Sequence, residues 1–170
     1  MNIRIEQLQE QDATTLFEFE CNNRDFFERI IASRGNDYYV YENYEQILKE
    51  LIAEQTRGES YFHLIKDDSN KIIGRVNLVN IDKINRTGEV GYRIGEEYGG
   101  RGIATKALSL MLKETEYYGV DELRAMVTHH NPASQHVLSK NNFVKLHTDK
   151  NAIEFNGEKY DLVHFKWRRT

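Results

Sequence analysis

Cysteine, proline and long hydrophobic runs are nearly or wholly absent from this chain. Its 170 residues include one cysteine, Cys21, and one proline, Pro132. A single cysteine excludes a disulfide framework and a clustered thiolate metal site. The charged N-terminal sequence MNIRIEQLQEQD has no apolar core and is no signal peptide, and no later run is long enough to span a membrane. We therefore expect a cytoplasmic protein without a membrane partner.

A surplus of basic residues is also absent. Lysine and arginine together number 23 against 27 for aspartate and glutamate, which gives a formal net charge of −4. Nucleic-acid-binding domains are normally basic, so this charge argues against a nucleic-acid partner and favours an amine or another basic substrate. Charged residues make up 29% and hydrophobic residues 39% of the chain, a globular balance that suits one domain over residues 1–170.

Alternating hydrophobic residues predict a series of β-strands. The alternation occupies these stretches: residues 3–6, 61–66, 72–81, 88–94, 123–128, and 143–167, the last turning at Asn156-Gly157. Three strands that follow one another from residue 61 should form an antiparallel meander. The stretch 123–128 follows a helix and should pair in parallel with an earlier strand.

Hydrophobic residues at helical spacing predict about four helices. They are a helix at 13–19 capped by Asp12, a helix at 47–52 that stops near Gly58, a helix from near Gly102 to Tyr118, and a helix from Pro132 capped by Asn131. The predicted fold class is therefore α/β in the α+β sense. We expect a single domain whose mixed, mostly antiparallel twisted sheet of six to seven strands is flanked by these helices.

The region between residues 22 and 44 is less regular and rich in aromatic residues. These residues are Phe26, Phe27, Tyr38, Tyr39, Tyr41 and Tyr44. Aromatic side chains at this density usually pack on one another or on neighbouring helices. The alternative is that they form the wall of a substrate pocket.

The most informative stretch is a glycine-rich hinge between the strand at 88–94 and the helix that follows it. Gly99, Gly100 and Gly102 have no Cβ, so the backbone can fold tightly and bring successive N–H groups close to one ligand group. These amides lie at the start of a helix, where unpaired N–H groups and the helix dipole favour an anion. The hinge is therefore predicted to bind a phosphate group.

Two other glycine-rich phosphate sites fit this hinge poorly. A P-loop needs Lys-Ser or Lys-Thr after its last glycine, and this chain has Arg101-Gly102. A dinucleotide fingerprint needs a third small residue three places after Gly102, where this chain has Thr105. It also needs an acid at the end of the next strand, whereas Glu122 stands at the start of that strand.

The hinge resembles the acyl-CoA hinge of the GCN5-related N-acetyltransferase (GNAT) family, Gln/Arg-x-x-Gly-x-Gly/Ala. Gly102-Ile103-Ala104 matches the second half of this motif, and Thr105 follows it. The first position is Gly99 in place of Gln or Arg. Because the family uses this hinge chiefly through backbone amides, the change weakens a side-chain contact more than it weakens the site.

A second motif resembles the same family. Asn131-Pro132-Ala133-Ser134 is similar to its Asn-x-x-Ser helix, and Lys140-Asn141-Asn142-Phe143 is similar to its closing Lys-x-Gly-Phe. The resemblance covers almost the full length of the chain. The motif Gly91-Tyr92 and the ending from Asn156-Gly157 to Asp161 look most like the RimJ/RimL-like branch. That branch acetylates protein N-termini, including those of ribosomal proteins, and also holds enzymes for small amines.

The resemblance implies an acetyl-CoA-dependent N-acetyltransferase whose acceptor is a primary amine, either a protein N-terminus or a small molecule. Direct attack of the amine on the thioester agrees with the lack of a Ser-His or Cys-His nucleophile motif. The resemblance implies that Asn131 and the backbones of Tyr92 and Ile94 hold the pantetheine arm. The hinge residues implied at the cofactor are Gly99, Gly100, Arg101, Gly102, Ile103, Ala104 and Thr105.

Direct attack needs a base for the amine and a partner for the departing thiolate. Glu89 is the first candidate base, with Glu154 or a bridging water as alternatives, and a plain solvated carboxylate as the other interpretation. Many family members use a tyrosine acid in the helix after the asparagine, where this chain has Leu138. Ser134 matches a serine proposed in the RimL-like branch to hold the sulfur. The other interpretation of Ser134 is a first-turn serine that satisfies a backbone N–H.

Two functions from other classes remain open. One is a non-catalytic acyl-CoA-binding sensor with the same fold, and the other is a different nucleotide-phosphate binder that uses the same hinge. His129 and His130 are adjacent strand residues that point to opposite faces, and no ligand spacing follows them, so no metal site is predicted. The sequence leaves open the amine, the acyl length, and whether the protein is a monomer or a homodimer.

Overall fold

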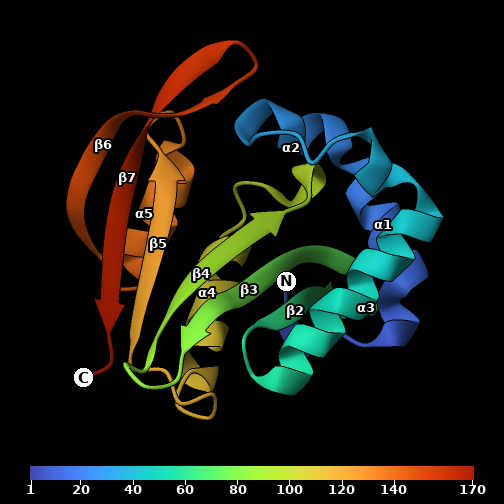
Figure 1. The fold of residues 1–170 in the computed structure, drawn as a ribbon, viewed down its shortest axis with the longest axis horizontal. Helices are drawn as coiled ribbons and strands as arrows, with labels where there is room; N and C mark the ends of the chain where they lie inside the picture. Colours follow the sequence, from blue (N-terminus) through green and yellow to red (C-terminus); the bar gives the residue numbers. More distant parts are fainter.

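The computed structural model describes residues 1–170 and holds one seven-stranded sheet in the order β1-β2-β3-β4-β5-β7-β6 (Figure 1). Neighbouring strands are antiparallel except β4 and β5, which run parallel. The strands are β1 (Ile3–Gln7), β2 (Tyr61–Asp67), β3 (Ile72–Asp82), β4 (Thr87–Ile94), β5 (Glu122–Thr128), β6 (Val144–Phe155) and β7 (Glu158–Arg168). The mixed, mostly antiparallel sheet predicted from the sequence is confirmed.

Five α-helices flank the sheet, with α1, α2 and α3 on one face and α4 and α5 on the other (Figure 1). They are α1 (Ala13–Asn22), α2 (Arg24–Ile30), α3 (Tyr41–Arg57), α4 (Ile103–Glu114) and α5 (Pro132–Lys140). The helix beyond the expected number is α2, which lies in the region of irregular pattern. Short 3₁₀ turns precede α1, α3 and α4: Glu10–Asp12, Asn36–Tyr39 and Glu96–Tyr98.

The two faces of the sheet bury two separate hydrophobic clusters, because successive strand residues point to opposite sides. Leu78 and Val90 belong to the cluster that includes Met111 of α4. Phe62 belongs to the other cluster, together with Leu48 of α3. The first cluster fixes α4 against β4, the strand that leads into the glycine hinge.

The aromatic residues between 22 and 44 pack mainly on one another, as the first of the two interpretations predicts. The ring centroids of Tyr38 and Tyr44 lie 5.3 Å apart, and those of Phe26 and Phe27 lie 5.7 Å apart. Phe27 and Tyr44 are almost completely buried. These rings therefore belong to the core on the α1–α3 face.

The helix ends agree with the sequence prediction at Gly58 and Asn131 and differ at Asp12 and Tyr118. Gly58 ends α3 in the left-handed conformation at φ 70°, as predicted. The predicted side-chain cap by Asp12 is wrong, because its Oδ2 accepts a hydrogen bond from the Gln9 N–H at 2.8 Å and closes the preceding turn. The helix α4 ends at Glu114, so Tyr118 lies in the turns beyond it.

Tyr118 anchors the end of α4 to the sheet although it lies outside the helix. Its ring stacks on Tyr61 of β2 with centroids 3.8 Å apart, and its hydroxyl lies 3.0 Å from His63 Nε2. His63 is 3% exposed, and its Nδ1 is buried without a hydrogen-bond partner. Burial lowers the pKa of His63 to about 4.

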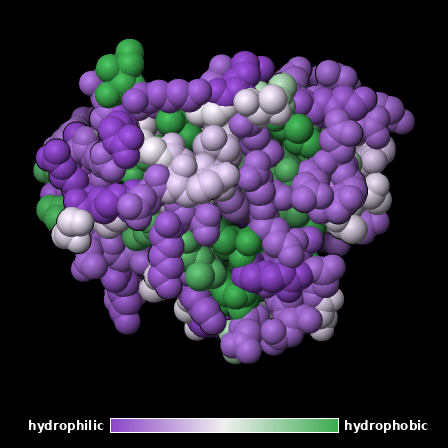
Figure 2. Space-filling view, turned by 90° about the horizontal axis from the view of Figure 1, so that it is seen from below, coloured by the Kyte–Doolittle hydropathy of each residue, from purple (hydrophilic) through white to green (hydrophobic).

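The surface is hydrophilic over most of the face seen from below, and its hydrophobic areas are small and separate (Figure 2). The large hydrophobic side chains with the greatest exposure include Ile84, Tyr117 and Val144, which lie on different segments. No helix has the length and apolar character needed to cross a bilayer.

The buried His63 should make the stability of the protein depend on pH. An unfolded histidine has a pKa near 6.5, so the unfolded chain binds a proton that the folded chain binds only near pH 4. Stability should therefore be complete above about pH 6.5 and fall by about 2 kcal/mol between pH 7 and pH 5. Urea unfolding of the His63→Gln variant should show a smaller fall, whereas His136→Gln, at an exposed position on α5, should behave as the parent. Equal pH dependence in all three proteins would contradict this assignment.

Candidate active site

The parallel strands β4 and β5 pair over only three residues and then diverge. The pairs are Thr87 with Glu122, Gly88 with Leu123, and Glu89 with Arg124. Beyond them β4 continues beside β3 alone, and Figure 1 shows β4 and β5 separating toward their carboxyl ends. The second half of β4 is therefore splayed away from β5.

The main chain of β4 has unpaired groups along this split. The Gly95 N–H donates to the Ile73 carbonyl oxygen of β3 at 2.9 Å. Because successive strand residues direct their main-chain groups to opposite edges, those of Tyr92 and Ile94 point toward β5, which has moved away. The structure therefore offers the backbone groups that sequence reasoning assigned to the pantetheine arm.

The glycine hinge lies between the wide end of the split and the start of α4. Gly100 and Gly102 both adopt a left-handed conformation at φ 74°, and no heavy atom lies within 4 Å of where a Cβ would be. Gly102 is the cap residue of α4 but provides no side-chain bond, and the first intrahelical bond runs from the Lys106 N–H to the Gly102 carbonyl. The N–H groups of Ile103, Ala104 and Thr105 thus lack helical acceptors, and open space lies beside Gly100 and Gly102, an arrangement that suits a pyrophosphate.

The two remaining hinge residues, Gly99 and Arg101, have less direct roles in the predicted phosphate site. Gly99 has an extended backbone at φ −63° and needs no glycine conformation of its own. The Arg101 guanidinium lies 5.6 Å from the Tyr98 ring centroid, at an exposed position beside the hinge. It can supply positive charge to a phosphate group by a small change of side-chain conformation.

Asn131 caps α5 as predicted. Its Oδ1 accepts a hydrogen bond from the Ser134 N–H at 3.2 Å, and Pro132 takes the first helical position. Its Nδ2 donates no hydrogen bond within the protein, so the two roles predicted for Asn131 can use different atoms of one amide. The cap also uses the backbone of Ser134 and leaves its hydroxyl free for another partner.

That partner is Tyr92, which sequence reasoning placed in the core without a role for its side chain. Its hydroxyl oxygen lies 2.9 Å from both Oγ and the carbonyl oxygen of Ser134. Burial raises the pKa of Tyr92 to about 12, although the Ser134 hydrogen bond opposes this. The Ser134 hydroxyl therefore bonds a tyrosine, and no backbone N–H donates to it. The sequence offered one signal for this contact: Tyr92 shares the apolar face of β4 with Val90 and Ile94, and a buried tyrosine hydroxyl usually finds a polar partner.

Glu89 lies at the narrow end of the split, in its last strand pair. Its Oε2 accepts a hydrogen bond from Asn80 Nδ2 at 2.8 Å. Asn80 has a left-handed backbone at φ 52° beside an irregularity in the β3–β4 pairing, and such irregularities redirect side chains. Glu89 faces the α1–α3 side, whereas Tyr92 and Ser134 meet on the α4–α5 side.

The two other positions considered for proton transfer lie in different surroundings. Glu154 is an exposed residue of β6 opposite Lys159, and its carboxylate makes no hydrogen bond. Leu138 is fully buried in the core beside α4, and its hydrocarbon side chain has no acidic proton to donate. The Tyr92 hydroxyl contacts α5 at Ser134, one helical turn before Leu138.

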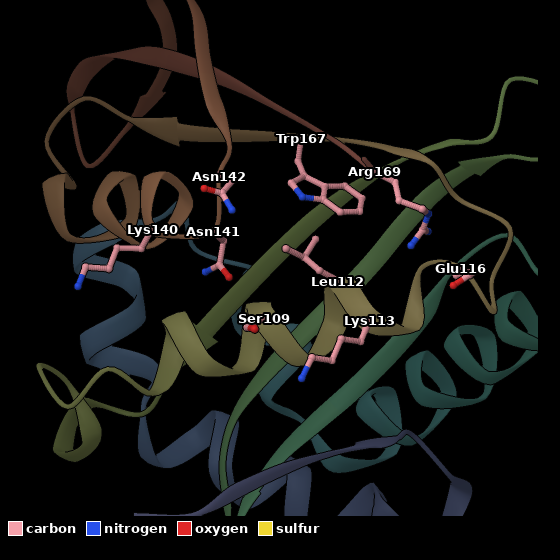
Figure 3. Close-up of a pocket in the computed structure, with 9 residues that line it drawn as sticks. All are labelled: Ser109, Leu112, Lys113, Glu116, Lys140, Asn141, Asn142, Trp167 and Arg169. Carbon is pink, nitrogen blue, oxygen red and sulfur yellow. The ribbon is translucent and has the colours of Figure 1, made fainter.

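A polar groove of about 590 Å³ runs between α4 and the end of α5 (Figure 3). It is lined by Ser109, Leu112, Lys113, Glu116, Lys140, Asn141, Asn142, Trp167 and Arg169. None of the residues predicted for catalysis or cofactor binding is among them. The groove is therefore separate from the site assembled at the split.

The histidines considered for a metal site are engaged elsewhere. His129 Nδ1 accepts a hydrogen bond from the Asp161 N–H at 2.9 Å, and the His130 ring packs on Tyr160 with centroids 4.2 Å apart. Sequence reasoning missed a different group of possible metal ligands, His147, Asp149 and His164. The irregular pairing of β6 with β7 brings these side chains together. Asp149 lies 2.8 Å from His164 Nε2 and 3.6 Å from His147 Nε2, two strands away from the split.

Comparison with known proteins gives a consistent result. The family model described as "Acetyltransferase (GNAT) domain" matches residues 2–144. The probable N-acetyltransferase YjcK of Bacillus subtilis is 29% identical over 91% of this chain and 87% of its own. Two solved structures share the fold.

The first is a ribosomal-protein-S5-alanine acetyltransferase from Vibrio fischeri, with a TM-score of 0.93, 23% identity, and coverage of 99% of this chain and 94% of that one. The second is RimL, a ribosomal L7/L12 alpha-N-protein acetyltransferase in complex with coenzyme A, with a TM-score of 0.89, 20% identity, and coverage of 99% and 95%. The hinge and the split fit the acetyl-CoA that such enzymes use. This chain therefore belongs to the GNAT acetyltransferase family.

Proposed function

We propose that this chain, acting as one N-acetyltransferase domain over residues 1–170, moves an acetyl group from acetyl-CoA to a primary amine by direct attack. The acceptor is a protein N-terminus or a small amine. The observation that carries the proposal is the split between β4 and β5, which has phosphate-binding amides at its wide end and a carboxylate at its narrow end. An acyl-enzyme is not needed, because the partner of the Ser134 hydroxyl is a tyrosine and not a histidine.

The chain holds its cosubstrate mainly through backbone groups. The first-turn amides of α4 bind the pyrophosphate, and the free main-chain groups of Tyr92 and Ile94 bind the pantetheine amides as a further strand would. Asn131 Nδ2 adds a donor from the α5 side of the split. This arrangement directs the thioester toward the narrow end, where β4 and β5 meet.

Glu89 removes the proton that the amine must lose before it attacks. Asn80 holds one carboxylate oxygen, which leaves Oε1 free to accept that proton directly or through one water. The same hydrogen bond fixes the side chain in one orientation. Proximity and orientation of this kind supply a large part of the rate in bimolecular reactions.

Ser134 and Tyr92 meet the negative charge that develops on sulfur. In the resting pair, the Tyr92 hydroxyl donates to the Ser134 carbonyl and the Ser134 hydroxyl donates to Tyr92. When Ser134 turns its proton toward sulfur, Tyr92 can turn its own proton toward Ser134 Oγ. With a pKa of about 12, Tyr92 keeps its proton at neutral pH and remains a donor.

A non-catalytic acyl-CoA sensor is the second candidate, favoured by the buried Leu138 where many relatives have a tyrosine acid. Turnover separates the two functions. Peptides with free N-termini, polyamines and amino-sugar drugs should be screened with acetyl-CoA, with acetylated products identified by mass spectrometry. Product from at least one amine supports the enzyme, whereas acetyl-CoA binding without any product supports the sensor. Displacement of CoA by ATP or NAD would favour a general nucleotide-phosphate binder.

The hinge assignment predicts that Gly102→Val abolishes most acetyl-CoA binding. A branched side chain at φ 74° is strained and would project into the space that the pyrophosphate needs. Saturating acetyl-CoA should raise the melting temperature of the parent by roughly 5–10 °C and that of the variant by much less. Gly35→Val is the control, because Gly35 also has a positive φ, at 85°, with open space around it, but lies far from the hinge in sequence. A folded Gly102→Val protein with the parent's shift would refute the assignment.

The role of Glu89 predicts that Glu89→Gln leaves acetyl-CoA binding intact and lowers the maximal rate about a hundredfold or more. The amide keeps the size of the side chain and the bond from Asn80 but cannot accept the proton. Glu154→Gln should change the rate little. A rate for Glu89→Gln within about threefold of the parent would make Glu89 an ordinary surface carboxylate.

The hydroxyl pair predicts that Ser134→Ala and Tyr92→Phe each lower the maximal rate more than they weaken acetyl-CoA binding. An interaction that strengthens as charge develops is felt in the transition state. The double variant should lose little more than the worse single variant, because the two hydroxyls act as one unit. Rates and melting temperatures should be measured on the same preparations. Destabilised variants with normal maximal rates would show that the pair only fastens β4 to α5.

A further inference from the structure

A buried ionic cluster joins β3 and β4 to α1 on the face that Glu89 shares. The Glu20 side chain has no exposed area. Its Oε1 accepts a hydrogen bond from Arg75 Nη1 at 2.7 Å, and its Oε2 accepts one from Arg93 Nη1 at 3.2 Å. The Arg75 and Arg93 side chains are 4% and 13% exposed.

The cluster holds more positive than negative charge. Burial alone would raise the pKa of Glu20, but Arg75, Arg93 and Arg34 bring it below its ordinary value, so the carboxylate is ionised. It is one anion beside two bonded guanidinium groups. Arg34 adds a third cation nearby at an exposed position, and its own hydrogen bond goes to the Tyr38 hydroxyl at 2.6 Å.

Two further acids, on α2 and in the turn before α4, have cationic partners of their own. Glu28 of α2 pairs with Arg24 at 3.0 Å, and Glu96 pairs with Arg29 at 2.9 Å. Glu20 is thus the only carboxylate that pairs with Arg75 and Arg93. Uncompensated charge that is largely removed from water is costly unless a ligand of opposite charge completes it.

Arg93 is the member of the cluster that can still bind a ligand. Its guanidinium makes one hydrogen bond, to Glu20, and lies over the Phe27 ring at 4.6 Å from the centroid. Nε and Nη2 have no acceptor and are not sealed from solvent. Burial lowers the pKa of Arg93 to about 10, with Glu20 opposing this and Arg34 and Arg75 adding to it. Its positive charge is therefore incompletely compensated.

The position of Arg93 relates it to the reaction. Glu89, Gly91 and Arg93 alternate with Val90 and Tyr92 along β4, so they share the α1–α3 face. No heavy atom lies within 4 Å of where a Cβ would be at Gly91, which leaves open space between the other two side chains. At the rise of an extended strand, Arg93 is about 7 Å from Gly91 and about 13 Å from Glu89.

The hairpin of β6 and β7 lies across from α2, on the far side of the space beside Gly91. In Figure 1 its tip extends toward α2, and Asn156 Nδ2 donates to the Glu28 carbonyl oxygen at 2.8 Å. An acceptor on this face of β4 therefore lies between α2 and the hairpin. Its amine would be near Glu89 and its following atoms would approach Arg93.

We propose that Arg93 is a carboxylate-binding subsite, and that the preferred acceptor is a peptide N-terminus followed by Asp or Glu within its first residues. The inference rests on the proposed acetyl transfer at Glu89. A free α-amino acid fits poorly, because its amine and carboxylate are only about 3 Å apart. A polyamine would place a second cation beside the guanidinium groups. The local charge thus points away from the basic substrate that the net charge of −4 favours.

The test compares amidated peptides that differ at one residue. Peptides of sequence Ser-X-Ala-Ala-Ala and Ser-Ala-X-Ala-Ala, with X as Asp, Asn or Lys, should be assayed for kcat/KM with acetyl-CoA. At whichever of the two positions shows the larger effect, the parent's kcat/KM should be about tenfold or more higher with Asp than with Asn, which is the scale of one charge-assisted hydrogen bond. The Lys peptide should have the lowest kcat/KM. Equal kcat/KM for all three peptides while acetylation proceeds would overturn the subsite and leave the proposed function standing.

Variants assign the preference to Arg93. Arg93→Met should abolish the preference for Asp, whereas Arg93→Lys, which keeps a cation beside Glu20, should retain part of it. Arg57→Met removes the same charge from the exposed end of α3, where Arg57 pairs with Glu59, and should keep the full preference. A preference that survives in folded Arg93→Met would overturn the subsite. Absence of acetylation with every peptide and other amine would refute the proposed function, and the subsite with it.

Discussion

The early end of pairing between β4 and β5 is the constraint on which the rest of the site depends. Main-chain groups that leave a sheet must find other partners, and here those of Tyr92 and Ile94 face a gap that no strand fills. The α4 helix packs against one face of β4 and presents its unpaired amides at the wide end of the gap. A ligand that carries both amides and phosphates can hydrogen-bond the main-chain groups of β4 and the first-turn N–H groups of α4 at the same time.

Local sequence signals were sufficient for most of the fold. The alternation of β2, β3 and β4, the Asn156-Gly157 turn and the Gly58 helix end each depend on a few neighbouring residues, and all appear in the structure. The hinge and the Asn131 cap are local in the same way. The helix α2 escaped prediction because its seven residues give too short a period, and because its aromatic side chains also serve the core.

The side-chain chemistry of the site was harder to predict from the sequence, because it depends on contacts between segments that are far apart in the chain. Tyr92 and Ser134 are 42 residues apart, and Glu20 is 55 residues from Arg75. Neither pairing follows from the sequence pattern of one segment alone. A serine predicted either to hold the sulfur or to serve its helix proved to bond a tyrosine on β4. A chain of negative net charge proved to bury a positive cluster beside the proposed acceptor space. Net charge informs about the whole molecule, whereas recognition depends on the few charges near the reacting atoms.

The most direct test of this account is residue-resolved amide hydrogen exchange with and without acetyl-CoA. The Tyr92 and Ile94 amides should exchange quickly in the free protein, because no strand covers them, and should slow at least about tenfold when the pantetheine arm occupies the split. The Gly95 amide, which is bonded to β3, serves as the internal reference and should change much less. Exchange at Tyr92 and Ile94 that is already slow without acetyl-CoA, or that stays unchanged at saturating acetyl-CoA, would contradict the central claim that this split is the cosubstrate site.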